Sequence, residues 1–153
     1  KGGGRPDSAM AGIGDKNKID EAINAFDGIV AQFVKYGRTK MEDCLFCKII
    51  NGDIPSKKVY EDDMCYAFYD IAPAAPIHFL VIPKEHIASA AEITHDNSAV
   101  VAHIFEIIAQ LSKEMGMKDG FRVVSNCGDC AGQTVHHLHF HVLSGRDFTW
   151  PAG

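Results

Sequence analysis

The sequence predicts an α+β domain in which a five-stranded antiparallel sheet is accompanied by two main helices. Several strand-like runs follow one another before a long helical pattern, an order that favours antiparallel pairing with segregated helices. The segments EDD and APAAP separate successive runs, because polar turns end strands and proline interrupts regular pairing. The chain has 153 residues, of which 46% are hydrophobic, and this is sufficient for one globular core.

The N-terminal part of the chain divides into a leader and a helix that precede the predicted domain of residues 41–153. The leader, residues 1–14, is rich in glycine and starts without methionine, so we expect a tag-like or disordered segment. Residues 15–40 predict an N-terminal amphipathic helix and a linker, because Ile19, Phe26 and other apolar residues recur at helical spacing. The polar face mixes acidic and basic residues, which favours packing against protein over contact with a membrane surface.

Within the domain, apolar and aromatic runs bounded by turn residues predict the strands. Apolar residues at helical spacing predict the second helix, which ends before Gly116, a residue type common at helix C-termini. In chain order the predictions are strands at 58–61, 65–70 and 77–83, the helix at 97–115, and strands at 121–126 and 135–143.

Charge and cysteine content limit the expected partners and compartment. The net charge of -5 argues against a surface that holds nucleic acid by counterion release, so no nucleic-acid partner is expected. No apolar run is long enough to span a membrane and no signal peptide is evident, so we expect a cytoplasmic protein without membrane contact. Four of the five cysteines form two Cys-x-x-Cys pairs, which in a reducing compartment favours metal binding over disulfides.

The segment HHLHFHV, which starts at His136, contains four of the eight histidines. Successive side chains of a strand point to opposite faces, so His137, His139 and His141 would share one face while the apolar residues between them face the core. A half-buried imidazole needs a hydrogen-bond partner or a metal, so three on one face indicate a functional site. Four further histidines are interpreted as structural or surface residues: His78, His95, His103 and His136.

Imidazole suits nucleophilic chemistry because it attacks at neutral pH without forming an anion and can also carry a proton. The loop before the histidines contains Gly128, Gly132, Gln133 and Thr134, which can present N–H, amide and hydroxyl donors to an anion. A phosphorus centre would gain most from such donors, because phosphoryl transfer depends on positioning and on neutralising oxygen charge. The residues therefore predict a phosphate-handling site.

The run HLHFHVL, residues 137–143, resembles the His-φ-His-φ-His-φ-φ signature of the histidine triad (HIT) superfamily, where φ is an apolar residue. Further segments resemble the HINT-like nucleotide-binding branch: LFCKIINGDIPSKKVYEDD, AFYDIAPAAPIHFLVIPKEHI and the terminal WPAG. The resemblance covers residues 43–153. It implies a HIT-type fold and the activity of a purine nucleoside phosphoramidase.

The resemblance also implies a role for each matching residue. His139 corresponds to a nucleophile that attacks the α-phosphorus of a purine nucleoside phosphoramidate or related adenylate, giving a nucleotidyl-histidine that water cleaves to the nucleoside monophosphate. The backbone near His137 would accept a hydrogen bond from His139, and His141 would contact phosphate oxygens or the leaving group. Nucleotide binding is implied for seven more residues: Asp70 at the ribose, Leu45, Phe46 and Ile71 at the base, and Asn126, Gln133 and Thr134 near the phosphate. Core packing is the alternative for the three apolar ones.

Cys44 and Cys47 form a compact half-site whose thiolates suit zinc, which needs two further ligands. The resemblance to some bacterial members and to uridylyltransferases implies that His86 and His137 complete a Cys2His2 site. One structural zinc per chain would then hold His137 in place without acting on the substrate.

Two alternatives to this metal site remain open. The presence of two Cys-x-x-Cys pairs by itself favours a four-cysteine site that adds Cys127 and Cys130 to the first pair. That site ranks lower, because the loop carrying the second pair is expected to wrap the phosphate. The other alternative is a chain without metal, since many members of the superfamily lack zinc.

Two other functions also remain open: a nucleotide-binding regulatory or scaffold protein, and a dinucleoside polyphosphate hydrolase. The WPAG terminus resembles the HINT-like branch and favours the phosphoramidase over the second of these. The tail and the paired sheets of the family imply a homodimer. The expected ligand is a purine nucleotide, with adenine and guanine not distinguished.

Overall fold

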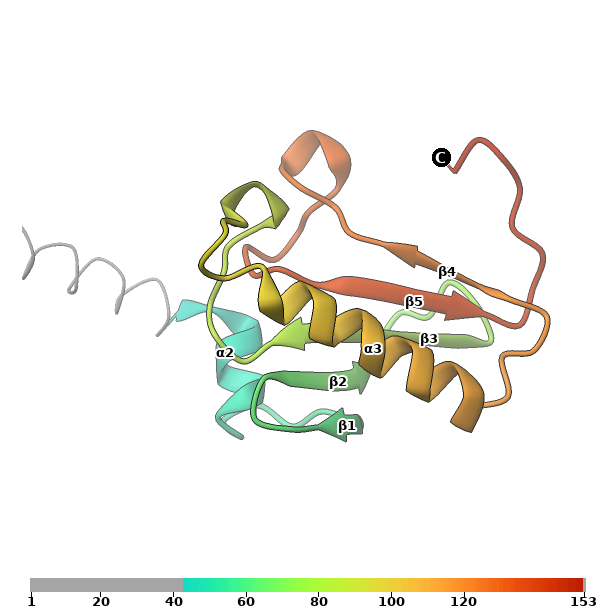
Figure 1. Ribbon diagram of the computed structural model, residues 1–153, viewed down its shortest axis with the longest axis horizontal. Coiled ribbons are helices and arrows are strands. Elements are labelled where there is room, and N and C mark those ends of the chain that lie inside the picture. Colours follow the sequence, from blue (N-terminus) through green and yellow to red (C-terminus); the bar gives the residue numbers. More distant parts are fainter. Residues whose placement is uncertain (1–42, 153) are drawn as a thin grey trace, which may run out of the picture. The chain divides into compact units, whose positions relative to one another are not determined.

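The computed structural model describes residues 43–152, and these form a five-stranded antiparallel sheet with a helix on each face (Figure 1). The strand order is β1-β2-β3-β5-β4, and every neighbouring pair is antiparallel. The predicted α+β class with a five-stranded antiparallel sheet is therefore confirmed. The predicted leader and N-terminal helix, residues 1–40, lie outside the described residues, and the division of the chain into three segments stays a prediction.

Most predicted elements are present with small changes at their ends. The strands β1 and β3 have the predicted bounds, β2 ends one residue early, and β4 ends two residues early. The elements are α2 (Leu45–Ile50), β1 (Lys58–Glu61), β2 (Cys65–Tyr69), β3 (Ile77–Pro83), a 3-10 turn (Ala90–Glu92), α3 (Ala99–Glu114), β4 (Phe121–Val124), a second 3-10 turn (Asp129–Ala131) and β5 (Phe140–Ser144).

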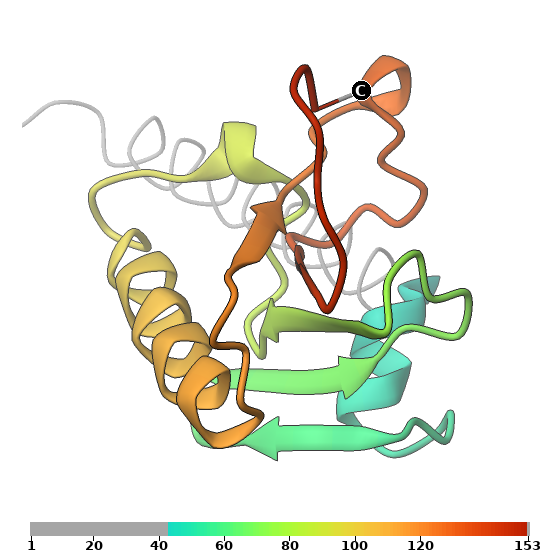
Figure 2. The same ribbon diagram turned by 90° about the vertical axis from the view of Figure 1, so that its right-hand side faces the viewer.

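The larger hydrophobic cluster lies between the sheet and α3. Phe79 of β3 and Phe140 of β5 are buried there with Ile104 and Ile108 of the helix. Figure 2 shows α3 lying along this side of the sheet. Leu138 also belongs to this cluster, as predicted for the apolar residues between the histidines. The histidine side chains are therefore left to the opposite face.

The opposite face is covered by α2, a six-residue helix that the sequence analysis missed. Phe46 and Ile49 of α2 pack with Phe68 of β2 and Leu80 of β3. The helix is too short to show a periodic pattern, and a peptide of this length is not helical alone, so tertiary packing stabilises it. It ends before Gly52, whose φ of 83° is typical of the residue after a helix.

The last strand begins later than predicted, at Phe140 instead of residue 135. Its pairing with β3 starts at Val81↔Phe140, and the remaining positions of β3 lead to Pro83, which has no N–H to extend the ladder. The Leu138 N–H instead donates to the Ile87 carbonyl oxygen over 2.6 Å. Of the three alternating histidines, only His141 therefore lies within a strand.

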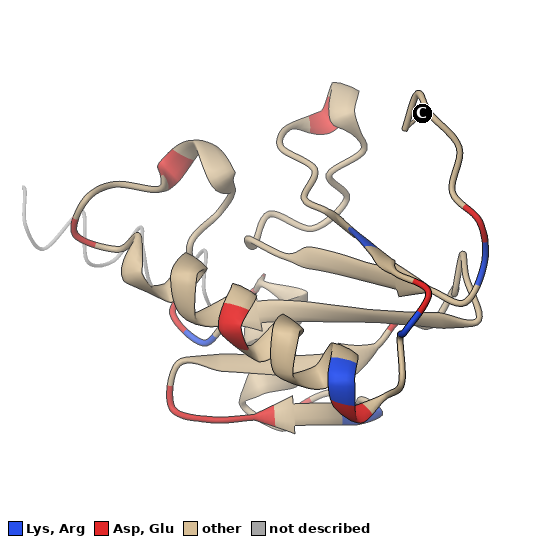
Figure 3. Ribbon diagram, turned by 45° about the vertical axis from the view of Figure 1, so that its right-hand side comes forward, with Lys and Arg blue, Asp and Glu red and all other residues tan. Residues whose placement is uncertain are grey.

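The charged residues of the described part are mixed in sign. Figure 3 shows acidic residues on α3, on both 3-10 turns and between β1 and β2, with basic residues interspersed. The expected absence of a nucleic-acid partner rests on the net charge of -5 and stays a prediction. The longest described helix, α3, has 16 residues, and none of the helices in residues 43–152 combines the length and hydropathy of a membrane span.

Candidate active site and metal site

Five histidine side chains form a continuous group on the α2 face of the sheet. His78 comes from β3, His86 follows β3, and His137, His139 and His141 come from β5 and the residues before it. Ring centroids are 5.0 Å apart for His86 and His137, and 5.1 Å apart both for His139 and His141 and for His78 and His141. One end of the group faces the cysteines of α2, and the other faces Asp70.

Phe46 of α2 lies against the middle of this group. Its ring meets those of His137 and His139 edge-on, with centroids 5.8 and 5.4 Å apart. Because Phe46 is itself buried in the α2 cluster, the packing of that helix determines where the His139 ring lies. His139 is 4% exposed and therefore recessed from bulk water.

The tautomer of His139 follows from one hydrogen bond. Its Nδ1 lies 2.7 Å from the carbonyl oxygen of His137, which can only accept, so Nδ1 carries the proton. The other ring nitrogen, Nε2, then keeps its lone pair, and no described residue forms a hydrogen bond with it. This is the protonation state that a nucleophilic imidazole requires.

The tautomers of His78 and His141 follow in the same way. The Ala74 N–H donates to His78 Nδ1 over 3.0 Å, so that nitrogen is unprotonated and His78 carries its proton on Nε2. His78 Nε2–H in turn donates to His141 Nδ1 over 2.9 Å. His141 must therefore carry its proton on Nε2. The result is an N–H donor on His141 next to a lone pair on His139.

Burial lowers the pKa of His141 to about 4, and the neighbouring His139 and His78 add to this shift while the Asp70 carboxylate opposes it. At neutral pH His141 is therefore an uncharged N–H donor. A metal ion bound between His78, His141 and Asp70 is incompatible with the tautomers described above. Coordination by His78 Nε2 would place a proton on Nδ1, which would then oppose the Ala74 N–H.

Cys44, Cys47, His86 and His137 come together as predicted, and their ligand atoms all lie within 4.8 Å of one another. Cys47 Sγ is 3.4 Å from His86 Nδ1 and 3.6 Å from His137 Nδ1, and Cys44 Sγ is 3.5 Å from His137 Nδ1. Sulfur and nitrogen ligands of a tetrahedral zinc, at about 2.3 and 2.05 Å from the ion, lie about 3.6 Å apart. The spacing fits zinc, and it also fits S–H···N hydrogen bonds in a metal-free chain.

Protonation in this cluster suits a metal site. Burial raises the pKa of Cys47 to about 12, and Cys44 adds to the shift, so without a cation the thiol stays protonated. Burial likewise lowers the pKa of His137 to about 4. His137 Nε2–H donates to the Pro83 carbonyl oxygen over 2.9 Å, which leaves an Nδ1 lone pair directed at the thiols. Cys127 and Cys130 are exposed and lie outside this cluster, so the structure does not support the four-cysteine alternative.

Asp70, the residue expected at the ribose, lies at the other end of the histidine group. One carboxylate oxygen accepts from the Ala72 N–H over 2.8 Å. The other is 3.5 Å from His78 Nε2 and 3.7 Å from His141 Nδ1. Asp70 therefore retains an oxygen that can accept a further hydrogen bond beside the histidines.

Gln133, expected near the phosphate, has its side chain bonded within the protein. Its amide donates to the carbonyl oxygens of Ala88 and Val135 and accepts from the Gly128 N–H, and the residue is 4% exposed. Gln133 therefore anchors the connection between β4 and β5 at Gly128. The other two residues expected at the phosphate lie in the same connection and are more accessible: Asn126 is partly buried and Thr134 is exposed.

The three residues expected at the base differ in burial. Phe46 is a core residue that also contacts His139, so it combines both interpretations. Leu45 is 44% exposed and Ile71 is fully exposed, so neither is a core residue. An exposed apolar side chain beside Asp70 is available to a ligand.

His78, which the sequence indicates as a structural or surface residue, is the member of this histidine group that the sequence did not place at the site. It is buried and belongs to the hydrogen-bonded group described above. Its position gave a signal, because it is the single polar residue of the otherwise apolar strand Ile77–Pro83. A buried polar side chain in a strand needs a partner, and that requirement points to a neighbouring strand.

Comparisons with known proteins agree with this fold. A family model described as HIT domain matches residues 51–148. An uncharacterized HIT-like protein of Synechococcus elongatus is 47% identical over 112 residues, which are 73% of this chain and 98% of that protein. A solved HIT family hydrolase of Legionella pneumophila has a TM-score of 0.71 and 45% identity, covering 72% of this chain and 100% of its own. A histidine triad nucleotide-binding protein of Candida albicans has a TM-score of 0.62 and 36% identity, covering 72% and 85%.

Proposed function

Since this chain belongs to the HIT family, we propose that it is a nucleotide hydrolase that cleaves purine nucleoside phosphoramidates and related adenylates. The observation that carries the proposal is the pair of complementary ring nitrogens described above. His139 has a free lone pair on Nε2, and His141 has a proton on Nε2. The centroids of the two rings are 5.1 Å apart. A nucleophile beside a hydrogen-bond donor suits attack on phosphorus, where negative charge develops on the oxygens.

In the proposed reaction, His139 Nε2 forms a bond to the α-phosphorus as the phosphorus–nitrogen bond of the substrate breaks. The departing amine takes up a proton from solvent water, and a nucleotidyl-histidine remains; the later hydrolysis by water returns one proton to solvent. The His139 Nδ1–H stays bonded to the His137 carbonyl oxygen, which stabilises the positive charge that the ring acquires. His141 donates its Nε2–H to a phosphoryl oxygen or to the leaving group. Water then breaks the phosphorus–nitrogen bond to His139 and releases the nucleoside monophosphate.

The nucleotide is proposed to lie between the β2–β3 loop and the loop that contains Asn126 and Thr134. Asp70 would accept hydrogen bonds from the ribose hydroxyls with its free oxygen. The apolar side chains of Leu45 and Ile71 would contact the purine, since both are exposed. The name of the Candida albicans protein, nucleotide-binding, supports this ligand class.

We propose in addition that Cys44, Cys47, His86 and His137 hold one structural zinc ion. When bound, zinc would keep the four side chains together and orient His137. The His137 carbonyl oxygen, which fixes the proton on His139, belongs to the same residue. The metal site would therefore stabilise the active site from one side without touching the substrate.

The test is the turnover of an adenosine phosphoramidate by His139→Ala. Loss of the nucleophile should lower kcat by at least about 10³-fold while binding of adenosine monophosphate is retained. His136→Ala is the matched control, because His136 neighbours the group in sequence but its side chain is 70% exposed. Undiminished turnover in His139→Ala would exclude the mechanism.

Comparing leaving groups separates the alternatives. If substrates with an amine leaving group are cleaved fastest, the protein is a phosphoramidase. Faster cleavage of a dinucleoside polyphosphate supports a dinucleoside polyphosphate hydrolase instead. Nucleotide binding without measurable turnover of either would support a regulatory or scaffold protein.

A further inference from the structure

The loop between β2 and β3, residues 70–76, joins the proposed active site to the C-terminal segment. The loop begins with Asp70, and the N–H of Ala74 determines the proton position on His78. Residues 71–74 are exposed and Ala75 is buried, so burial holds the loop beside Ala74 but not Ala74 itself. A further contact to the Ala74 backbone would help to keep its N–H directed at His78.

Arg146 makes such a contact, because its Nε–H donates to the Ala74 carbonyl oxygen over 3.1 Å. The guanidinium is held in turn by Phe148, whose ring centroid lies 4.3 Å from Arg146 Cζ. Beside it, Gly145 approaches Pro76 so closely that a Cβ added to Gly145 would lie 3.0 Å from the Pro76 Cβ. The C-terminal segment therefore touches the loop at two successive residues.

The register of the sheet explains why a side chain makes this bond. Pairing between β3 and β5 reaches Ile77↔Ser144, so Pro76 and Gly145 are the next residues outward. Pro76 has no N–H to donate, and Gly145 has a φ of 89°, which lies outside the strand region. The backbone ladder stops there, and Arg146 supplies the next donor from its side chain.

We propose that Arg146 is a positioning residue that sets the tautomers of the active-site histidines through the Ala74 backbone. While the Ala74 N–H points at His78 Nδ1, His78 is confined to the Nε2–H form and His141 presents its own Nε2–H. If the loop shifts, His78 Nδ1 can take the proton, and the bond between the two rings can reverse. His141 then loses the proton from Nε2 and becomes an acceptor where the reaction needs a donor.

Arg146→Met tests this inference, because it keeps most of the apolar stem and removes the donor. The ¹⁵N NMR shifts of the ring nitrogens, in full-length protein labelled at histidine, report which nitrogen is protonated. We expect Nε2–H on both His78 and His141 in the wild-type protein and a mixture of tautomers on both in the variant. The effect on turnover rests on the proposed function, and there kcat should fall about 3- to 10-fold with a smaller change in KM.

Arg122→Met is the matched control. Arg122 lies over the same Phe148 ring, with Cζ 4.8 Å from its centroid, but its hydrogen bond goes to the Thr149 carbonyl oxygen. The control should leave the ¹⁵N shifts of the histidine rings and kcat unchanged. Arg146→Lys can still donate to the Ala74 carbonyl oxygen, so its ring-nitrogen shifts and kcat should be close to those of the wild-type protein. Unchanged ring-nitrogen shifts in Arg146→Met, or equal changes in Arg122→Met, overturn the inference. Absence of turnover in a wild-type protein with the assigned tautomers overturns the proposed function instead.

Discussion

At the scale of single residues, the sequence predicts which side chains come together but not where the protons on the histidine rings lie. Cys44 and Cys47 were predicted as metal ligands from their spacing and His86 and His137 from the resemblance, and the structure brings these four side chains together. The proton positions on His78, His139 and His141 could not be read from the sequence. Each depends on a backbone group at a distance that only folding determines, such as the Ala74 N–H or the His137 carbonyl oxygen.

The metal site leads to a prediction for Cys44. Protein purified without chelator should contain about one zinc per chain, and Cys44→Ser should lose it, because oxygen of a serine is a poor replacement for a buried thiolate. Elemental analysis of dialysed protein measures the ratio. Cys127→Ser is the matched control, since Cys127 is exposed and should not affect zinc content. Full retention of zinc by Cys44→Ser refutes the assignment, and loss in the control would favour the four-cysteine alternative.

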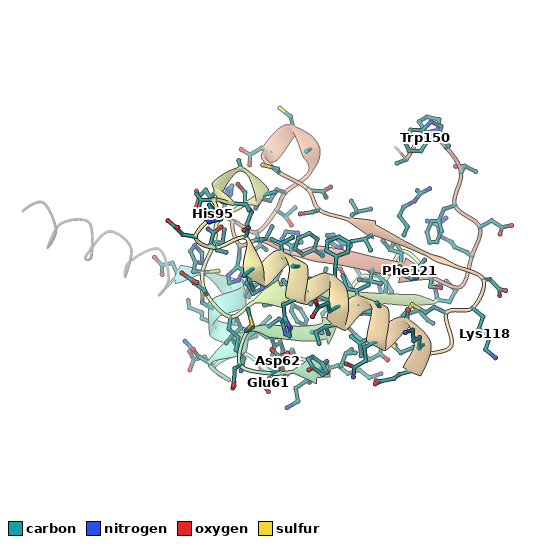
Figure 4. The ribbon with its side chains drawn as sticks, in the orientation of Figure 1. Glu61, Asp62, His95, Lys118, Phe121 and Trp150 are labelled. Carbon is teal, nitrogen blue, oxygen red and sulfur yellow. The ribbon has the colours of Figure 1, made fainter. Side chains whose placement is uncertain are left out.

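At the scale of secondary-structure elements, the connection between the β1–β2 turn and α3 is a feature that the sequence analysis did not anticipate. Asp62 accepts hydrogen bonds from the N–H groups of Met64 and Cys65, both over 2.8 Å, which closes the turn. Its other oxygen is 2.6 Å from His103 Nε2 on α3 and accepts from the Tyr60 hydroxyl over 3.1 Å. Figure 4 shows Asp62 at this turn. One carboxylate therefore ties a hairpin to a helix.

The charge on Asp62 is maintained by these bonds. Burial alone would raise the pKa of Asp62, but the hydrogen bonds from Cys65, His103, Met64 and Tyr60 together hold it well below its usual range. The folded form therefore binds this proton more weakly than the unfolded form. The stabilisation is present above about pH 4, the ordinary aspartate pKa, and is lost as the pH falls below it.

His103→Ala should lower the free energy of unfolding by about 1.5 to 3 kcal/mol at neutral pH, the range for a lost hydrogen bond to a charged group. Urea unfolding followed by circular dichroism measures the change. His95→Ala provides the comparison, because His95 is exposed and its change should stay within about 0.5 kcal/mol. Equal stabilities of the two variants would show that the Asp62–His103 pair contributes nothing.

For the whole molecule, the two edge strands of the sheet differ in how readily they could pair with a strand of a second chain. At the β1 edge the register shifts between Lys58 and Tyr60, and charged residues occupy both ends of the strand, features that discourage edge-to-edge association. At the β4 edge four consecutive residues pair regularly with β5, and Phe121 is 41% exposed. The homodimer implied by the resemblance stays a prediction, and β4 is the edge that we expect it to use.

This expectation can be tested on the mass of the protein in solution. Light scattering at micromolar concentration should give the mass of two chains, and Phe121→Glu should shift it towards one chain by placing a charge in the interface. Met64→Glu is the control, because Met64 is 39% exposed at the turn of the opposite edge. A wild-type mass of one chain contradicts the dimer, and an unchanged mass in Phe121→Glu contradicts the choice of edge.

The C-terminal tail also concerns the whole molecule, because its exposed side chains do not pack on the sheet. Trp150 is 87% exposed and projects away from the sheet (Figure 4). Arg122 and Arg146 both lie over the ring of the nearby Phe148, so the tail leaves the domain from a defined position. A large exposed aromatic residue is suited to contact with another surface.

By itself the sequence determined the strands in their order along the chain, the helical span of α3 and the alternation of the histidine run, because alternation and helical spacing are properties of neighbouring residues. The histidine run shows both the success and the limit of such patterns. Leu138 and Phe140 face the core as predicted, but the strand begins only at Phe140. Tertiary structure alone decided the rest. It ordered α2, ended the β3–β5 ladder at Val81↔Phe140 and assigned each proton in the site, because these features depend on contacts between segments far apart in the chain.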